Sequence, residues 1–330
     1  MRSAIWFALA CVAARAAVDG VILNGTTGKP QAGVNVLLVQ PSEKGMEPLG
    51  VAKSDAAGAF RVDKDPAANG PTLVQATYQG VTYTAVLAPK QPRTGVQVRV
   101  YEANANRAKV AVDRHGILFQ PGEGKVLVQE FVFIDNSGNT TFNDAVNGTY
   151  QFFVDGDPTL DIQITAPGSM PVKRTAEKTG APGTYRLKFP MRPGQTQIEL
   201  SYETAKSEPL QASGKVLHTD GEIRLIVPRG FKLEGAGLEA FQPEPRTQSP
   251  IYGVKPGPYR VTISGKAAAA ASEPEEDPGM NEIKASRPRI YDRFYPVLGL
   301  LLATLAAGMW LVSLNRKKEA PAPPPAKKKK

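Results

Sequence analysis

Residues that build most enzyme sites and covalent cross-links are scarce in this sequence. Its 330 residues include one cysteine, Cys11, and two histidines, His115 and His218. A single thiol cannot form an intrachain disulfide or a cysteine-based zinc site. Because Cys11 lies in a segment that we expect to be cleaved off, the mature chain also lacks a thiol nucleophile.

The usual catalytic and metal-binding motifs are missing as well. Neither histidine, in "RHGIL" and "LHTDGE", is followed three residues later by the glutamate of a zinc carboxypeptidase motif. The sequence has no Gly-x-Ser-x-Gly elbow, no glycine-rich phosphate loop and no dinucleotide fingerprint. The run "DNSGNTTFND" from Asp135 is no EF-hand, because Val146 stands where the glutamate belongs, and it fits a hairpin turn. We expect no catalytic, cofactor-binding or metal-binding residues, and ordinary strand-edge or turn roles for His115 and His218.

The sequence also has few aromatic residues, and the part between its two ends carries little net charge. Phe, Trp and Tyr make up 7% of the sequence, which leaves few rings for a sugar-stacking platform. The formal charge of +9 is concentrated at the ends, because the tail "NRKKEAPAPPPAKKKK" has seven Lys or Arg and one Glu, and Arg2 and Arg15 add two more positive charges. The rest is close to neutral, so we expect no nucleic-acid partner.

The first sixteen residues have the pattern of a secretory signal peptide. In "MRSAIWFALACVAARAAVDG", Arg2 precedes an apolar run from Ala4 to Ala14. Ala14 and Ala16 have the spacing of a small-residue cleavage site. We predict a signal peptide at 1–16, cleavage after Ala16 and export of the chain that follows.

A long hydrophobic run lies near the other end of the sequence. "VLGLLLATLAAGMWLVSL", from Val297 to Leu314, has no charged residue. As a helix it would measure about 27 Å, enough to span a bilayer. The basic residues of "NRKK" follow it directly and favour a cytoplasmic C-terminus. We predict a transmembrane helix at 294–314 and a short cytoplasmic tail at 315–330.

Between these ends, apolar and polar residues alternate, and turn residues recur at short intervals. The alternation is clear in "VDGVILN", "VNVLLVQ", "TLVQATY", "KVLVQEFVFID" and "TQIELSYE". A period of two is typical of strands with one buried face. The sequence therefore predicts an all-β fold of tandem β-sandwiches with few helices.

Three segments between Val18 and Tyr101 carry recognisable motifs: "GVILNGTTGKPQAGVNVLLV", "SDAAGAF" and "LVQATYQG". Their motif residues are Gly28, Lys29, Pro30, Gly33, Asp55, Gly58, Tyr78 and Gly80. This region, which we bound at 17–103, resembles the carboxypeptidase regulatory-like domain. The resemblance implies a seven-stranded, transthyretin-like β-sandwich and names no ligand. From the residues themselves we expect Asp55 to bind backbone amides of its own turn and Gly58 to take a positive φ.

The remaining chain divides by its pattern into further units. We predict a second β-sandwich at 104–206. Residues 207–266 form either a third small β unit or the completion of the second, with a hairpin turn at Asp220-Gly221. Residues 267–293 have no apolar periodicity and are interpreted as a juxtamembrane linker. The linker contains an acidic cluster of Glu273, Glu275, Glu276 and Asp277.

These features predict a non-enzymatic, single-pass membrane protein whose sandwiches face the periplasm or cell exterior and act by binding or scaffolding. We expect a protein partner in the cell envelope, with a glycan-binding envelope module as the next alternative. An endoplasmic reticulum membrane protein with a lumenal β-sandwich is a further alternative, favoured by the terminal lysines and the Asn-x-Thr sequons at Asn24, Asn139 and Asn147. An envelope hydrolase is the last alternative.

Overall fold

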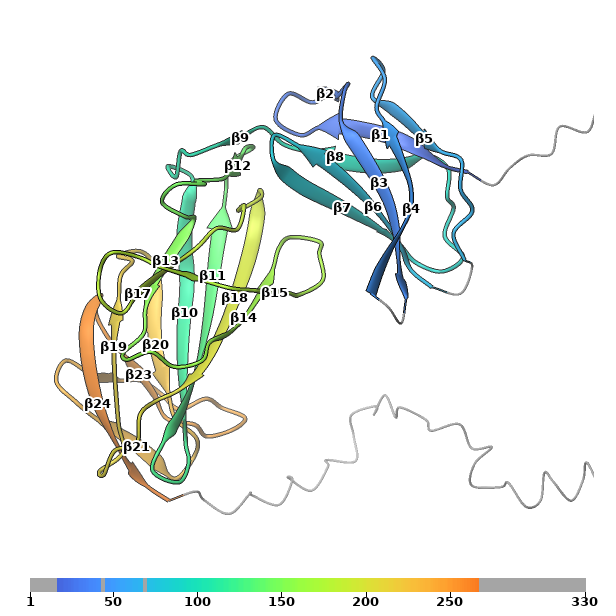
Figure 1. Ribbon diagram of the computed structural model, residues 1–330. Coiled ribbons are helices and arrows are strands. Elements are labelled where there is room, and N and C mark those ends of the chain that lie inside the picture. The colour runs from blue at the N-terminus through green and yellow to red at the C-terminus, as the bar shows by residue number, and fades with distance from the viewer. Residues whose placement is uncertain (1–16, 43–44, 68–69, 267–330) are drawn as a thin grey trace, which may run out of the picture. The chain divides into compact units, whose positions relative to one another are not determined.

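The computed structural model describes residues 17–42, 45–67 and 70–266 (Figure 1). These residues belong to one compact unit of strands, turns and loops, without an α-helix among them. The predicted all-β fold is confirmed for this part of the chain. Within it, no helix is both long enough and apolar enough to cross a membrane. The predicted signal peptide, linker, transmembrane helix and tail lie outside the described residues.

The first sandwich is built from two four-stranded sheets. One sheet contains β1 (Val18–Asn24), β2 (Lys29–Pro30), β5 (Ala59–Val62) and β8 (Val96–Val100). The other has the order β4 (Gly45–Lys53), β3 (Asn35–Ser42), β6 (Thr72–Tyr78) and β7 (Val81–Leu87). Alternate side chains point inward and form one apolar cluster, in which Ile22 and Leu38 are fully buried. The alternation seen in the sequence therefore produces the two facing sheets.

Two glycines of the first sandwich are required by close backbone contacts. β1 and β8 run parallel, with Gly20 opposite Val96. A Cβ atom at position 20 would overlap the carbonyl oxygen of Val96. Gly58 has a φ of +73°, and a Cβ atom there would lie 2.6 Å from the carbonyl oxygen of Ile22. Both positions exclude larger residues without a shift of the backbone.

The turn predicted at Asp55 is present. Oδ1 of Asp55 accepts hydrogen bonds from the backbone amides of Ala57 at 2.9 Å and Ala59 at 2.8 Å. Together with the positive φ of Gly58, these bonds close the turn that leads into β5. The motif is a structural element of the sandwich.

The second sandwich places a large sheet against two smaller ones. The eight-stranded sheet has the order β15 (Val172–Arg174), β14 (Asp161–Thr165), β18 (Gly194–Glu203), β11 (Val126–Asn136), β10 (Val110–Pro121), β20 (Glu222–Ile226), β23 (Ile251–Gly253) and β22 (Glu239–Ala240). One three-stranded sheet contains β13 (Tyr150–Phe153), β17 (Thr184–Leu187) and β16 (Glu177–Lys178). The other contains β19 (Gln211–Val216), β24 (Gly257–Gly265) and β21 (Phe231–Glu234).

Residues 207–266 share a sheet and a core with residues 104–206. β20 lies parallel to β10, with Arg114 opposite Glu222 and Leu118 opposite Ile226. One apolar cluster extends from Val110 to Ile263 and includes buried residues from both segments. The side chains of β10 and β11 thus pack on strands that come much later in the sequence.

Two predicted hairpin turns are wrong. At Asp220-Gly221, the preceding strand β19 pairs with β24, and the following strand β20 pairs with β10 and β23. The segment therefore crosses between sheets, and Oδ2 of Asp220 accepts a hydrogen bond from the Val112 amide at 2.7 Å. After Asp135, the chain leads to β12 (Thr141–Phe142), which pairs with β9 (Ala103–Asn104) and not with β11. Local turn residues predicted a reversal, but the pairing of distant strands decided the path.

Hydrogen bonds join the two sandwiches where the chain passes from one to the other. The hydroxyl group of Tyr83 in β7 lies 2.9 Å from the carbonyl oxygen of Tyr101 and 2.8 Å from Oγ1 of Thr141. Oγ1 of Thr26 donates to the carbonyl oxygen of Asn139 at 2.6 Å. Tyr83 of β7 is thus tied to β12, and Thr26 of the β1–β2 turn is tied to the loop that precedes β12.

Candidate functional site

The two histidines lie side by side in the interior of the second sandwich. His115 belongs to β10 and His218 to the segment between β19 and β20, and 4% and 7% of their surfaces are exposed. Nδ1 of His115 lies 2.9 Å from Nε2 of His218. Nε2 of His115 lies 3.0 Å from Oε2 of Glu130, whose other carboxylate oxygen accepts a bond from the Tyr202 hydroxyl group at 3.1 Å. The strand-edge or turn role predicted for His115 is wrong, because it lies in the middle of a central strand.

We call these four side chains the histidine cluster: His115, Glu130, Tyr202 and His218. The hydrogen bonds of the cluster determine how many protons it holds. The carbonyl oxygen of Asp220, 2.7 Å from Nδ1 of His218, has no proton to give, so this nitrogen donates. One proton lies between the two rings, and one lies between His115 and Glu130. The two rings and the carboxyl group therefore share three protons, one more than two neutral imidazoles hold. The cluster is neutral overall.

The electrostatics of the cluster disfavour a positive charge on the His218 ring. Burial lowers the pKa of His218, and the neighbouring His115 lowers it further. Burial raises the pKa of Tyr202, and the charge of Glu130 acts in the same direction. Tyr202 therefore keeps its proton and donates it to the carboxylate.

Each ring nitrogen in the cluster already bonds a protein atom. Among the described residues, no group of three or more His, Cys, Asp or Glu side chains is arranged to hold a metal ion. Glu130 is the one residue whose position in the sequence indicated a buried polar cluster, and we did not predict the cluster from it. It occupies an inward position of the alternating strand, between Val128 and Val132, and a buried carboxylate requires a buried partner.

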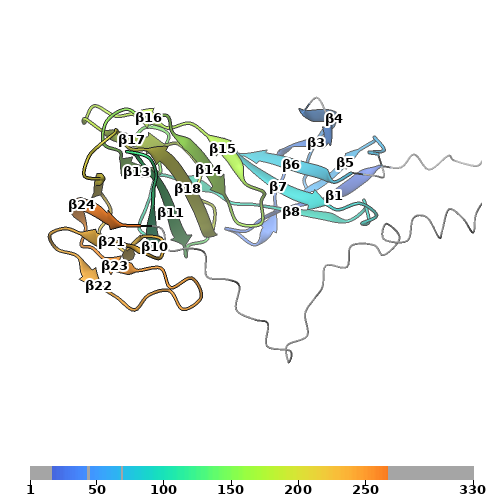
Figure 2. The ribbon, with the colours of Figure 1, turned by 90° about the horizontal axis from the view of Figure 1, so that it is seen from below.

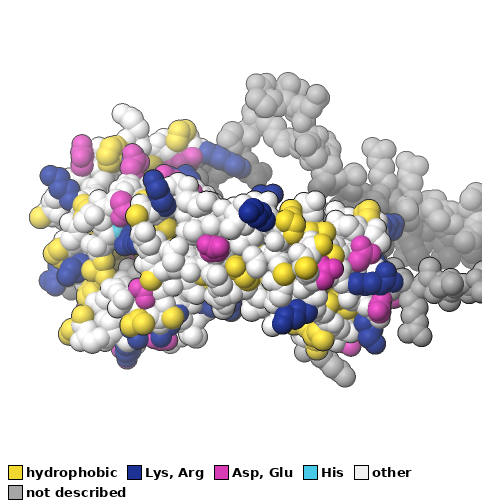
Figure 3. Space-filling model, turned by 90° about the horizontal axis from the view of Figure 1, so that it is seen from above, with side chains coloured by type: hydrophobic (Ala, Val, Ile, Leu, Met, Phe, Trp, Pro, Cys, Tyr) yellow, Lys and Arg dark blue, Asp and Glu magenta, His cyan; other side chains and the backbone are white. Residues whose placement is uncertain are grey.

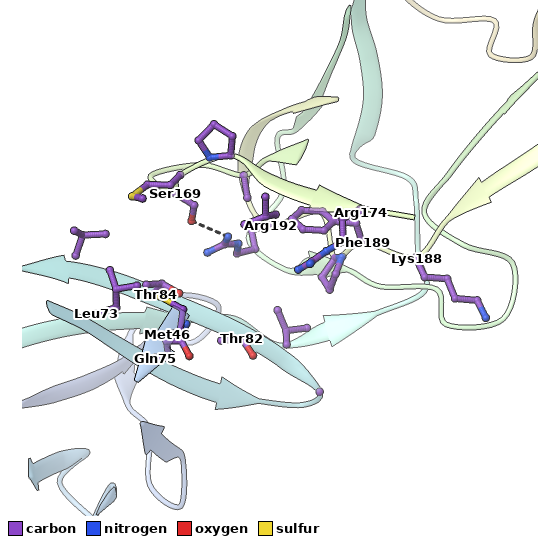
Figure 4. A pocket seen from close by; sticks show the side chains of 18 residues that line it. Met46, Leu73, Gln75, Thr82, Thr84, Ser169, Arg174, Lys188, Phe189 and Arg192 are labelled. Atoms are coloured by element: carbon purple, nitrogen blue, oxygen red, sulfur yellow. Dashed lines mark hydrogen bonds between the residues drawn. The ribbon is translucent and has the colours of Figure 1, made fainter. Parts of the chain in front are cut away.

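An open cleft lies between β7 of the first sandwich and the hairpin that contains β15 (Figure 4). Its volume is about 530 Å³. This hairpin lies beside β6 and β7 in the view of Figure 2. The first sandwich contributes Met46, Leu73, Gln75, Thr82, Thr84 and Val86, and the second contributes Ser169, Met170, Val172, Arg174, Lys188, Phe189 and Arg192. We call this set the junction cleft.

Exposed apolar side chains gather in the junction cleft. Of the seven large hydrophobic residues that are most exposed in the described part of the chain, four line it. They are Met46 (53% exposed), Val86 (40%), Met170 (60%) and Val172 (37%). Single exposed apolar residues are ordinary on a protein surface, whereas a gathering of them in a concave region is typical of a binding site.

The charged groups of the cleft are all cationic. Arg174, Lys188 and Arg192 line it, and no Asp or Glu is among the described lining residues. The Arg192 guanidinium donates to Oγ of Ser169 at 2.9 Å and lies 5.8 Å from the ring centroid of Tyr83. Burial lowers the pKa of Arg192. By contrast, the face shown in Figure 3 has Lys, Arg, Asp and Glu side chains interspersed.

Both strands at the mouth of the cleft are sheet edges. β7 pairs only with β6, and β15 pairs only with β14 among the described strands. Sheet edges offer unpaired backbone groups to another strand. Nothing in the sequence indicated this cleft, because Val86 and Val172 follow the same alternation as any outward-facing strand residue.

Comparison with known proteins adds little to this description. No family model matches the chain, and no curated protein matches it. Among matching solved structures is a mutant M1 zinc metallopeptidase from Deinococcus radiodurans bound to a Tyr-Ser-Ala substrate, at 13% sequence identity and a TM-score of 0.26. The match covers 52% of this chain and 51% of that one, so the chain spans about half the length of the metallopeptidase. Similarity at this level carries no argument about function.

Proposed function

We propose that this chain is a membrane-anchored, exported protein without catalytic activity that binds or scaffolds another protein of the cell envelope. The observation that carries the proposal is the junction cleft. Exposed apolar residues from both sandwiches meet there, in a concave region bordered by two sheet edges. Covering such a surface with a polypeptide removes apolar area from water and therefore lowers the free energy.

The proposal includes a location and a finer fold assignment. The pattern of residues 1–16 supports export, and the apolar run from Val297 to Leu314 supports a single membrane span with the body outside. The motif residues between Val18 and Tyr101 support a carboxypeptidase regulatory-like first sandwich. Tethering next to other membrane proteins would raise the effective concentration of the cleft toward them.

A protein partner fits the cleft better than a glycan. Sugar recognition relies on exposed aromatic faces, and Phe189 is the one aromatic residue among the described lining residues. Its surface is 8% exposed, and the Arg174 guanidinium lies 5.6 Å from its ring centroid. The ring is therefore not free to stack on a sugar.

Photo-crosslinking in the native membrane tests this proposal. A photoreactive amino acid replaces Val172 or Val86 in the cleft, and Val51 serves as the matched control. Val51 is also an exposed strand valine, at 77%, but it does not line the cleft. We expect crosslinks to one envelope protein from the two cleft positions and none to it from position 51.

Two results would contradict the proposal. Equal crosslinking from position 51 would mean that the cleft is not the binding surface. Absence of a protein crosslink from both cleft positions, with the full chain present in the membrane, would argue against a protein-binding role.

A further inference from the structure

The cationic lining of the junction cleft indicates the chemistry of its partner, an inference that rests on the proposed binding function. We propose that the occupant is an extended segment of another protein that carries an apolar and an acidic side chain two residues apart, on the same side of the segment. Acidic side chains of the segment bind Arg174 and Arg192, and apolar ones cover Val172 and its neighbours.

The first argument comes from charge. Several cations of the second sandwich have a carboxylate nearby, as Lys178 has Asp157 at 2.7 Å and Lys188 has Glu177 at 3.0 Å. In the described part of the chain, Arg174 and Arg192 have no carboxylate partner. Arg192 is also partly buried, so its charge has lost part of its hydration without gaining a counter-ion. A carboxylate from a partner would supply that counter-ion through a charge-assisted hydrogen bond.

The second argument comes from spacing along β15. Val172 and Arg174 are two residues apart and both line the cleft, while Lys173 between them binds Asp161 at 3.1 Å. One side of this edge strand therefore presents an apolar residue followed by a cation. A strand laid against it would place an apolar residue and an acidic residue at the same spacing. The open edges of β15 and β7 provide backbone groups for such a strand.

The test uses the full chain in detergent micelles and synthetic probes. A fluorescein-labelled peptide of about ten residues has valine and glutamate in turn at every second position, with serine at the positions between them. It is compared by fluorescence anisotropy with a peptide that has lysine in place of glutamate. We expect the glutamate peptide to bind at low salt and the lysine peptide to bind at least tenfold more weakly. A glutamate peptide with N-methylated backbone amides should also bind more weakly, because it cannot pair as a strand.

Variants of the cleft arginines complete the test. Arg192→Gln and Arg174→Gln should each weaken binding of the glutamate peptide about tenfold, as expected for loss of one charge-assisted bond. Arg192→Lys keeps the charge and should retain most of the affinity. Arg99→Gln, in the exposed face of β8, is the matched control and should change nothing.

The outcomes separate this inference from the proposed function. Equal binding of the glutamate and lysine peptides, or no effect of the arginine variants, would overturn the acidic partner. Equal binding of the N-methylated peptide would overturn the extended, strand-paired form. Either result could stand beside crosslinks from Val172 in the membrane, in which case the binding function holds and only its chemistry is wrong.

Discussion

Both sandwiches bury neutral polar side chains, but the second also buries a cluster of titratable ones. In the first, the buried polar residues are neutral and serve nearby backbone groups. Oδ1 of Asn24 accepts bonds from the amides of Thr26 and Thr27 at 2.9 and 3.2 Å. Oγ of Ser54 accepts from the Val34 amide at 2.9 Å and donates to the Gln31 carbonyl oxygen at 2.7 Å. In the second sandwich, His115, Glu130 and His218 are titratable and bond mainly to one another.

The comparison shows that a buried polar group can stabilise either a single turn or the arrangement of distant strands. A neutral group that fixes a turn affects a few residues around it. A network of titratable side chains on β10, β11, β18 and the segment before β20 holds distant parts of the chain in one arrangement. Removing one member leaves the others unpaired in a low-dielectric interior, which is costly.

The largest effect should come from Glu130→Ala. The substitution leaves His115 Nε2 and the Tyr202 hydroxyl group without partners. Each buried polar group left unpaired costs about 1–3 kcal/mol, so the two together should cost about 2–6 kcal/mol. Urea unfolding followed by far-ultraviolet circular dichroism measures the change. The control is Glu203→Ala, which removes an exposed pair with Lys125 and should cost about 1 kcal/mol or less. A cost for Glu130→Ala equal to that of the control would contradict the role of the cluster.

A smaller effect is expected in the first sandwich from Gly58→Ala. Alanine would be strained at the positive φ, and its Cβ atom would approach the Ile22 carbonyl oxygen, so we expect a loss of about 1–3 kcal/mol. Gly80→Ala is the matched control, because Gly80 also has a positive φ but open space around it. The same unfolding experiment should show a larger loss for position 58. Equal losses would mean that strain alone, and not the contact, decides the cost.

Tyr83→Phe tests the connection between the sandwiches. It removes the hydroxyl group that bonds the Tyr101 carbonyl oxygen and Thr141, and a typical hydrogen bond contributes about 0.5–1.5 kcal/mol. We expect a slight loss of stability and faster proteolysis between the sandwiches, measured by limited digestion. Tyr78→Phe, with its exposed hydroxyl group near Gln79, should digest at the unchanged rate. Unchanged digestion of the Tyr83 variant would mean that other contacts hold the junction.

The smallest effect should be a pH dependence confined to the second sandwich, because the first has no histidine. The pKa of His218 is lowered by burial and by His115, while Asp220 acts in the opposite direction and Arg107 in the same one. As the pH falls below about 6.5, the unfolded chain protonates this ring before the folded chain does, so the free energy of unfolding decreases. Above that pH the contribution is complete. Urea midpoints at pH 7.5 and 5.5 should differ less in His218→Gln than in the unaltered protein; an equal difference would contradict this assignment.

The sequence was sufficient to predict the local features of the fold. Alternation predicted strands such as β1, β6, β11 and β18, and Asp55 and Gly58 predicted a turn that is present. These features depend on residues close in sequence, where the backbone preferences of glycine and the side-chain period of a strand suffice.

Features that depend on distant residues were not predictable in the same way. Asp220-Gly221 has the composition of a hairpin turn, yet it connects strands of different sheets. His115 and His218 each look ordinary in their own segments and form a cluster only because β10 pairs with β20. The junction cleft depends on how Val86 and Val172 approach one another from separate sandwiches. Only the inward position of Glu130 gave a local indication of a buried partner.

The parallel pair of β10 and β20 also sets the order in which the protein can fold as it is synthesised. The first sandwich closes with β8, so it can be complete soon after Val100 emerges from the ribosome. β10 emerges soon afterwards, but its neighbour β20 follows much later, and the bond between Val112 and Asp220 spans 108 positions. During that interval β10 has an edge to which other chains can pair. The second sandwich is therefore the late and vulnerable step in the biogenesis of this protein.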